Sequence, residues 1–289
     1  MAISRWTAIG CTAAGLSIFT VSTRLLPFHR ARHEKEASPT HRDSFATSVV
    51  TQNRHRGSQE NYSLLIPATR LKNDASDEEI LARFTKGFFT GLAFTPERWL
   101  LSAIPFPITD ILGICAPYNM NIITLKSNTH NHNRSLAINE TLAIRSQNAL
   151  RRFVVGPEIW DQSSISTRST PSVASLLFGN FLVLDSSLLT SAQRNQLPDD
   201  YILHAKPPHA FVEFAWGGEG LGLVGSHRFE VSRYRISQPA GAEEFVKVTF
   251  STLSCIPKTG LAPPNYLMWF HVLYSKFLFS DGIKGVLAE

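Results

Sequence analysis

Residues 211–255 alternate between apolar and polar side chains with a period of two, and this pattern constrains the fold more than any other feature of the chain. Phe229 and Val231, for example, alternate with Arg228 and Glu230. A period of two is typical of β-strands, and segments rich in glycine or proline divide the region into three of them. The strands are predicted at about 211–216, 225–234 and 244–255. Alternation on one side only is typical of an antiparallel sheet with one covered face.

A C-terminal helix is predicted to cover that face. Pro263 and Pro264 open the helix, and residues 265–280 carry a wide apolar stripe. The stripe consists of Leu267, Phe270, Leu273, Phe277 and Leu278. Because this helix contains His271 and Lys276 and is shorter than the roughly 20 residues of a membrane span, we expect it to belong to the core.

Two more helices are predicted upstream of the strands. Ser76 and Glu79 form a capping box, which places a helix at about 77–90. Thr95 begins another helix, and the side chains of Trp99, Leu100 and Leu101 are expected to enter the core. Shorter elements are predicted as a strand at 122–125, a helix at 140–152 and a strand at 181–184. The predicted fold class is therefore α+β, with a curved antiparallel sheet packed on a long C-terminal helix and additional N-terminal helices.

The composition is that of a globular protein. Of the 289 residues, 43% are hydrophobic and 18% are charged, which excludes a wholly disordered chain. No interior stretch is apolar enough for a protein that crosses a membrane several times. The three cysteines, Cys11, Cys115 and Cys255, are too few and too far apart for a disulfide framework or a zinc site.

The net charge of +5 is concentrated near the N-terminus. Residues 1–60 contain eight basic and four acidic side chains and so carry +4, which leaves the rest of the chain nearly neutral. Binding to nucleic acid needs a clustered basic face, so we expect no nucleic-acid partner. Residues 25–60 have little apolar periodicity and are predicted to be a disordered basic linker, followed by a single α+β domain at 61–289.

Residues 1–24 are predicted to be a membrane anchor or a targeting segment, because residues 6–23 hold no charge and lie between Arg5 and Arg24. A single-pass anchor is the first interpretation, since a helix of this length, at about 1.5 Å per residue, crosses a thin bilayer. A mitochondrial presequence and a secretory signal are the alternatives. The basic residues that follow the segment favour a cytosolic body. Three sequons favour the secretory pathway and glycosylation instead, and their acceptors are Asn61, Asn133 and Asn139.

Motifs of common enzyme classes either are missing from the sequence or have plainer explanations. Gly218–Gly222 resembles a phosphate-binding loop, but it joins two strands and opens no helix, so a hairpin turn is expected. His130 and His132 lack a third ligand at helical spacing, which argues against a metal site. The chain has no Gly-x-Ser-x-Gly elbow, no Walker lysine motif and no His-Glu-x-x-His. We expect neither a metal nor a cofactor.

The order of elements in the C-terminal half resembles a known type of domain. The run Trp-Gly-Gly, Gly-Ser-His-Arg-Phe-Glu-Val, from Trp216 to Val231, precedes the strand Val-Thr-Phe-Ser-Thr-Leu-Ser and a helix opened by two prolines. This order is similar to that of helix-grip domains of the START-like and polyketide-cyclase-like type. Phe94–Trp99 also resembles a Phe-x-Pro-Glu-Arg-Trp helix of uncharacterised fungal proteins. The resemblance covers about 76–104 and 174–285.

The helix-grip resemblance implies a cavity for a hydrophobic ligand between the sheet and the C-terminal helix. Some members of this superfamily are cyclases or isomerases, and others only bind or transfer lipids. The Asn-rich segment at 119–139 departs from the family outline, which leaves the first half of the sheet unassigned. A fold-level resemblance does not establish an activity.

Strand parity selects the candidate catalytic residues. His227 shares a face with Phe229, and a histidine among apolar neighbours has a pKa that moves easily near neutrality. We therefore predict that His227 acts as an acid or a base, together with Glu213 or Tyr234. The plainer interpretations are a core histidine and, for Glu213, a surface residue or a cross-strand partner of Arg228. The predicted ligand-binding residues are Phe214, Trp216, Phe229 and Phe270.

Hypotheses from different classes follow from these observations. The first is a small cofactor-free enzyme of the cyclase or isomerase type, which acts on an apolar metabolite in fungal secondary-metabolite biosynthesis. The second is a membrane-tethered module that binds or transfers a lipid or another hydrophobic small molecule. The third is an interaction protein without a cavity. A buried pair of titratable groups at the cavity favours the enzyme, whereas a wholly apolar cavity favours the binding module.

Overall fold

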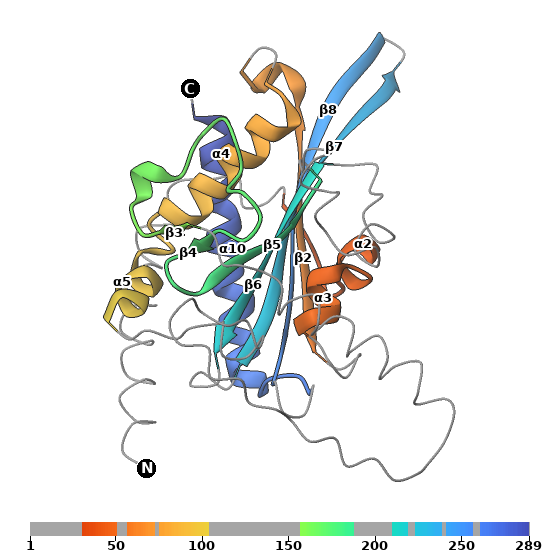
Figure 1. Ribbon diagram of the computed structural model, residues 1–289. Coiled ribbons are helices and arrows are strands. Elements are labelled where there is room, and N and C mark those ends of the chain that lie inside the picture. The colour runs from red at the N-terminus through yellow and green to blue at the C-terminus, as the bar shows by residue number, and fades with distance from the viewer. Residues whose placement is uncertain are drawn as a thin grey trace, which may run out of the picture.

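The computed structural model describes residues 31–50, 57–72, 75–103, 157–187, 210–218, 223–238, 241–256 and 261–288. An eight-stranded sheet runs through this part of the chain in the order β1-β2-β8-β7-β6-β5-β4-β3 (Figure 1). Neighbouring strands are antiparallel except for β3 and β4. The strands are β1 (Arg32–Glu34), β2 (Ser58–Pro67), β3 (Glu158–Ile159), β4 (Leu176–Leu177), β5 (Phe181–Ser186), β6 (Ala210–Gly218), β7 (Leu223–Gln238) and β8 (Gly241–Cys255).

Helices lie on both faces of this sheet. On one face α4 lies over β6 and β7, while α10 packs along α4 and reaches β2 (Figure 1). On the other face α3 lies against β5, β6 and β7, with α2 beside it. The fold class is α+β, as predicted. The helices are α2 (Pro39–Arg42), α3 (Phe45–Val50), α4 (Asp77–Thr90), α5 (Thr95–Ala103) and α10 (Asn265–Leu287), with 3-10 turns η2 (Ala68–Arg70) and η3 (Gln162–Ser164).

The three-strand meander is confirmed. β6, β7 and β8 pair in sequence order, and each extends beyond its predicted bounds. At its centre Phe214 lies opposite His227, and His227 lies opposite Thr252. Directly opposed residues of antiparallel strands share a face, so each such row holds its side chains together. The predicted strand at 181–184 is present as part of β5.

Phenylalanines of α4 and of the meander form the centre of the core. The ring centroid of Phe88 lies 4.8 Å from that of Phe229 and 5.1 Å from that of Phe250. Phe89 lies 5.3 Å from Phe214 between ring centroids. All five side chains are fully buried, and their separations are typical of aromatic pairs in contact. Aromatic rings thus occupy the interface between α4 and the middle of the sheet.

Both upstream helices begin where the sequence predicts. The hydroxyl of Ser76 accepts a hydrogen bond of 3.1 Å from the backbone N–H of Glu79, which caps α4. In α5, however, Trp99 is 72% exposed, and Leu101 is the buried side chain. Residues two apart point to different sides of a helix, so α5 cannot bury both. The expectation that Trp99 enters the core is therefore wrong.

The prediction of a disordered linker at 25–60 is wrong for the described residues of that range. β1 pairs with β2, and α2 and α3 pack onto the sheet. The two helices bury polar side chains such as His41, Ser44 and Thr47 together with Phe45. A segment that docks mainly through polar contacts has no apolar periodicity, and this is why the sequence pattern did not reveal it.

The expectation of a sheet with one covered face is also wrong. Arg228 and Ser226 alternate with Phe229 along β7 and point to the opposite face, yet they are only 3% and 0% exposed. They lie beneath α2 and α3, where their polar groups find hydrogen-bond partners. Polar residues on this face therefore indicate a polar cover and not contact with solvent.

α10 extends beyond the predicted 265–280 and covers less of the sheet than expected. Its first half is open, since Phe270 and Leu267 are 37% and 36% exposed. Its second half packs on α4 where two glycines meet, because a Cβ on Gly87 would lie 2.5 Å from the carbonyl oxygen of Asp281 and 3.0 Å from the Cα of Gly285. The central position over the sheet, predicted for α10, belongs to α4.

Several predictions fall outside the described residues. They concern the strand at 122–125, the helix at 140–152, the two histidines His130 and His132, and the segment at 6–23. Among the residues that the structure describes, no helix has the length and apolar character needed to cross a membrane.

Substitutions in α10 should separate its buried half from its open half. Phe277 is 9% exposed and Phe270 is 37% exposed. Truncation of a buried phenylalanine typically costs about 3–5 kcal/mol, so Phe277→Ala should lower the free energy of unfolding strongly and Phe270→Ala much less. Chemical denaturation of both variants measures this difference. Equal losses would contradict the placement of the helix.

Removal of the N-terminal elements should destabilise the sheet. A chain that begins at residue 57 lacks β1, α2 and α3 and leaves Arg228 and its ionic partners without their cover. We expect this chain to unfold at a lower denaturant concentration than a chain that begins at residue 31, and to bind a hydrophobic dye. Indistinguishable unfolding curves would mean that α2 and α3 do not contribute to stability.

Candidate functional site

The sheet separates the residues that the sequence grouped into one catalytic site. His227 points towards α4, whereas Glu213 points towards α3, because they lie diagonally on β7 and β6 with opposite parity. Tyr234 lies further along β7, on the same side as Glu213, and is 43% exposed. The three residues therefore form no common constellation. Each face instead carries its own buried polar cluster.

The first cluster is centred on Arg228, and we call Glu213, Arg228 and Glu230 the Arg228 cluster. The guanidinium of Arg228 donates to the carboxylates of Glu213, at 2.7 Å, and of Glu230. Its carbon Cζ lies 3.7 Å from the centroid of the Phe211 ring. The predicted pairing of Glu213 with Arg228 is confirmed, but the pair is buried and does not lie on a surface.

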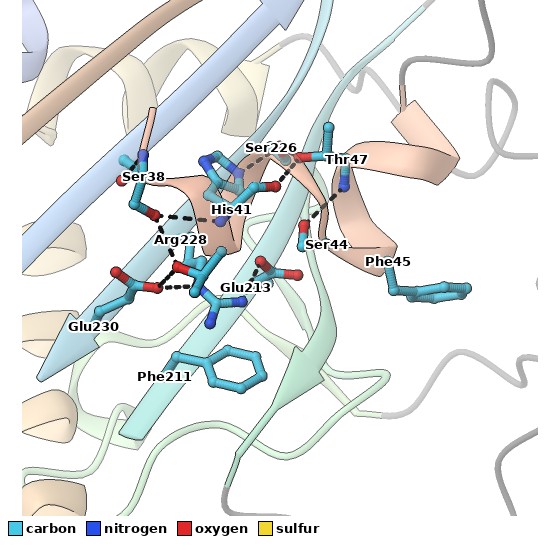
Figure 2. Close-up of polar contacts among 12 residues, drawn as sticks. Ser38, His41, Ser44, Phe45, Thr47, Phe211, Glu213, Ser226, Arg228 and Glu230 are labelled. Carbon is cyan, nitrogen blue, oxygen red and sulfur yellow. Dashed lines mark hydrogen bonds and ion pairs between the residues drawn. The ribbon is translucent and has the colours of Figure 1, made fainter. Parts of the chain in front are cut away.

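Hydrogen bonds join α2 to this cluster and to its strand (Figure 2). The hydroxyl of Thr40 donates to Glu230 at 2.7 Å, and Nε2 of His41 lies 2.8 Å from the hydroxyl of Ser226. Burial, with a smaller contribution from the charge of Arg228, lowers the pKa of His41 to about 3. A neutral His41 is thus part of the contact that holds α2 on β7.

The Arg228 cluster is best interpreted as a structural tie. Burial raises the pKa of Glu213 to about 7, although the charge of Arg228 opposes the shift and the nearby Asp185 adds to it. The guanidinium has carboxylates on two sides and an aromatic ring against its face, so its binding capacity is used within the protein. Loss of one member of such a buried group leaves an uncompensated charge.

The second cluster lies on the face of α4 and α10. Glu60 on β2 pairs with Thr252 on β8, and Thr252 pairs with His227 on β7, which makes one polar row across three strands. Trp216 and His271 lie beside this row. We call these five residues, Glu60, Thr252, His227, Trp216 and His271, the His227 cluster. The ring centroid of Trp216 lies 5.4 Å from that of His227 and 6.1 Å from that of His271.

Local sequence explains how Trp216 reaches this position. It lies opposite Gly225 on β7, and a Cβ on Gly225 would come within 2.4 Å of the indole ring. The glycine therefore allows the indole to lie flat on the neighbouring strand, beside His227. Trp216 and His227 are two residues that the sequence singled out, and the structure brings them together.

The side chains of His227 and Thr252 are buried and make no hydrogen bond among the described residues. Both ring nitrogens of His227, the indole N–H of Trp216 and the hydroxyl of Thr252 lack a partner within the described part of the chain. The imidazole ring is enclosed by Phe88, Phe181 and Phe250, at centroid distances of 5.1–5.8 Å. Burial, and to a lesser degree the nearby histidines, lowers the pKa of His227 well below its usual value. The imidazole is therefore neutral at neutral pH.

Glu60 and His271 connect the cluster to the surface. Nδ1 of His271 lies 3.4 Å from Oε1 of Glu60, and the side chain of His271 is 21% exposed while that of Glu60 is 4% exposed. The hydroxyl of Tyr62 shares its one proton between Oε2 of Glu60, at 3.1 Å, and the carbonyl oxygen of Val272, at 2.7 Å. Burial and the charge of Glu60 raise the pKa of Tyr62, so it remains a donor.

The predicted ligand-binding residues fall in three different environments. Phe214 and Phe229 are core side chains with no exposed surface, whereas Trp216 belongs to the His227 cluster. Phe270 is exposed on α10 and stacks on Tyr274, so it does not join the others.

Glycosylation at Asn61 does not fit the folded chain. Asn61 is 5% exposed, donates to Glu34 and accepts from Ser251. A glycan on this buried amide would displace both partners, so the folded chain argues against the predicted glycosylation of Asn61. The sequons at Asn133 and Asn139 lie outside the described residues.

Sequence reasoning missed Glu60, Thr252 and His271. Glu60 was assigned to the linker, although it shares the parity of Tyr62 and Ile66 along β2, a period-two signal that marks a strand. Thr252 has the parity of Phe250 and so belongs to the same face. His271 was recognised only as a polar residue within a core helix.

Comparison with protein-family models, with curated proteins and with solved structures finds no match to this chain. The site is therefore interpreted from its own geometry.

The buried histidines predict a less stable fold in mild acid. The pKa of His41 is about 3 in the folded chain against 6.5 for the free side chain, so between these values the unfolded chain alone binds the proton. Its contribution to stability is complete above pH 6.5 and decreases below it, by at most about 1.4 kcal/mol per pH unit. Urea unfolding of His41→Gln from about pH 7.5 to about pH 5 should therefore show a smaller loss of stability than wild type.

Glu213 provides a control of opposite sign. Its pKa is raised from 4.5 to about 7, so in this range the folded chain binds the proton and gains stability as the pH falls. Glu213→Gln removes that gain and should steepen the loss of stability in acid. The same pH dependence in wild type and both variants would contradict the buried states described above.

Proposed function

We propose that the protein is a small cofactor-free enzyme that moves a proton on an apolar small molecule, as a cyclase or an isomerase does, with His227 as the base. The observation that carries the proposal is the group of unpartnered polar atoms on His227, Trp216 and Thr252. A buried polar group without a partner costs about 1–3 kcal/mol, so several of them together call for a ligand that satisfies them.

The chemistry of these groups suits acid–base catalysis. A neutral imidazole has one nitrogen that accepts a proton and one N–H that donates a hydrogen bond. The indole N–H of Trp216 supplies a second donor, which would hold a carbonyl oxygen whose charge grows as His227 removes the neighbouring proton. Glu60 and His271 are further titratable groups in the same cluster. A buried pair of titratable groups is expected in an enzyme and not in a simple carrier, so the presence of Glu60 next to His227 in this cluster favours an enzyme.

The helix-grip resemblance supports the same proposal in outline. It would place the activity among the cyclases and isomerases of fungal secondary metabolism, with the ligand between the sheet and the helices. The second candidate is a module that binds or transfers a hydrophobic molecule. The aromatic rings around His227 favour it, because they offer an apolar ligand a matching surface.

Exchange of an α-proton in a simple aryl ketone tests the proposed base. We expect the protein to accelerate uptake of deuterium from heavy water into the methyl group of 2-acetylnaphthalene, followed by proton NMR. The imidazole of His227 takes a proton from the methyl carbon and leaves an enolate. The imidazolium exchanges that proton for a deuteron from heavy water and gives the deuteron to the enolate carbon, which regenerates the ketone and the neutral imidazole. His227→Ala should lose about 10²–10⁴-fold of the acceleration, and the wild-type rate should decline only well below pH 6.5.

His33→Ala is the matched control. His33 is exposed on β1 outside the His227 cluster and stacks on Tyr62, so its loss should leave the exchange rate unchanged. Full activity of His227→Ala would disprove the role of His227. No activity in wild type, combined with an apolar molecule that copurifies with it, would favour the carrier instead.

A further inference from the structure

A base that is buried needs a route by which its proton returns to solvent. His227 is 5% exposed and is enclosed by phenylalanines, so a ketone must displace some of these side chains to reach its ring and, once bound, keeps bulk water from it. The imidazole lies at one end of a polar row whose other end leads to His271, which is 21% exposed. The proposed role of His227 as a base therefore raises the question of what this row does.

The polar row lies at the border of the apolar part of this face. In the next row on one side the corresponding positions hold Tyr62, Phe250 and Phe229, and in the next row on the other side they hold Ser58, Ser254 and Gly225. Among these three rows, only the row of His227 carries titratable side chains from two strands, Glu60 and His227, with a hydroxyl between them. Three polar side chains from three strands at one level are what a chain of proton carriers requires.

We propose that Thr252, Glu60 and His271 form a proton relay between His227 and solvent. Opposed residues of antiparallel strands have Cβ atoms about 4.5–5.5 Å apart, so the Thr252 hydroxyl lies between its two neighbours in the row. That hydroxyl makes no hydrogen bond among the described residues, so the relay requires it to turn towards each of the two neighbours in the course of the transfer. The last step spans the 3.4 Å between Oε1 of Glu60 and Nδ1 of His271.

In each step of the relay one bond to hydrogen breaks and another forms, so that one proton moves on. The proton leaves a ring nitrogen of His227 for the oxygen of Thr252 as the hydroxyl proton of Thr252 passes to the carboxylate of Glu60. The carboxyl group then protonates Nδ1 of His271, and His271 releases the proton of its Nε2 to water. One proton has moved from His227 to solvent, Thr252 and Glu60 are unchanged, and His271 has changed tautomer.

The contacts around Glu60 fit this role. Tyr62 donates to Oε2 and so orients the carboxylate, leaving Oε1 towards His271. The hydroxyl of Ser275 lies 3.4 Å from the same Nδ1 and helps to orient the imidazole. Thr252, Glu60 and His271 are positioning residues for a reaction that His227 performs.

Exchange of the ring N–H of His227 with water tests the relay without any substrate. In 15N-labelled protein, NMR saturation transfer should show this proton exchanging about tenfold or more faster than the backbone N–H of His227, which exchanges only when the sheet opens. Thr252→Val keeps the shape of the side chain without its hydroxyl and should slow the ring exchange to the rate of the backbone N–H. Thr252→Ser should restore it.

Thr249→Val is the matched control. Thr249 is also buried on β8, but it points to the opposite face, next to Glu230. Its loss should leave the ratio of ring to backbone exchange unchanged. A wild-type ring proton that exchanges no faster than the backbone N–H, or a rapid exchange that persists in Thr252→Val, would overturn the relay.

The relay rests on the proposed function, but the two tests fail separately. Loss of the ketone activity in wild type with normal ring exchange would remove the proposed enzyme and leave the proton route intact. Normal ketone activity with slow ring exchange would overturn the relay alone.

Discussion

The packing of α4 on the meander is the interaction on which the rest of the fold depends. The ring of Phe88, for example, contacts Phe229 on β7, Phe250 on β8 and the imidazole of His227. The same helix fixes α10, because Gly87 lets the backbones of the two helices approach closely. α10 in turn places His271 beside Glu60 and Trp216. α4 thus packs on the sheet and positions α10, and through α10 it positions His271 at the outer side of the candidate site.

The two faces of β7 solve the burial of polar groups in different ways. On the side of α2 and α3, Arg228 is paired with two carboxylates and packs on the face of Phe211. This pairing compensates a charge that would otherwise be very costly to bury, although Oε2 of Glu213 and Nδ1 of His41 have no hydrogen-bond partner among the described residues. On the side of α4, His227 escapes the cost of a buried charge by remaining neutral. Within the part of the chain that the structure describes, neither Trp216 nor Thr252 forms a hydrogen bond with the ring nitrogens of His227.

Elements with regular periodicity were predictable from the sequence, and those docked by polar contacts were not. The alternation around Phe229 gave the meander and its parity, and the capping box at Ser76 gave the start of α4. α2 and α3 escaped prediction because their buried side chains, such as His41, are polar. Parity within single strands did not separate His227 from Glu213, because the pairing of β6 with β7 decides which of their residues share a face. Which strand would supply Glu60 depended on long-range pairing of β2 with β8, which no local pattern specifies.

The contrast between the faces bears on where function resides. A protein that needed only stability would gain from filling the position of His227 with another phenylalanine, as its neighbours Phe88, Phe181 and Phe250 show. An unsatisfied imidazole destabilises the fold by about 1–3 kcal/mol, and stability alone gives no reason to retain it. Residues that break local rules at a cost to stability are expected at functional sites. Arg228, paired with two carboxylates, supports the fold, whereas the ring nitrogens of His227 are the atoms that the proposed ligand would satisfy.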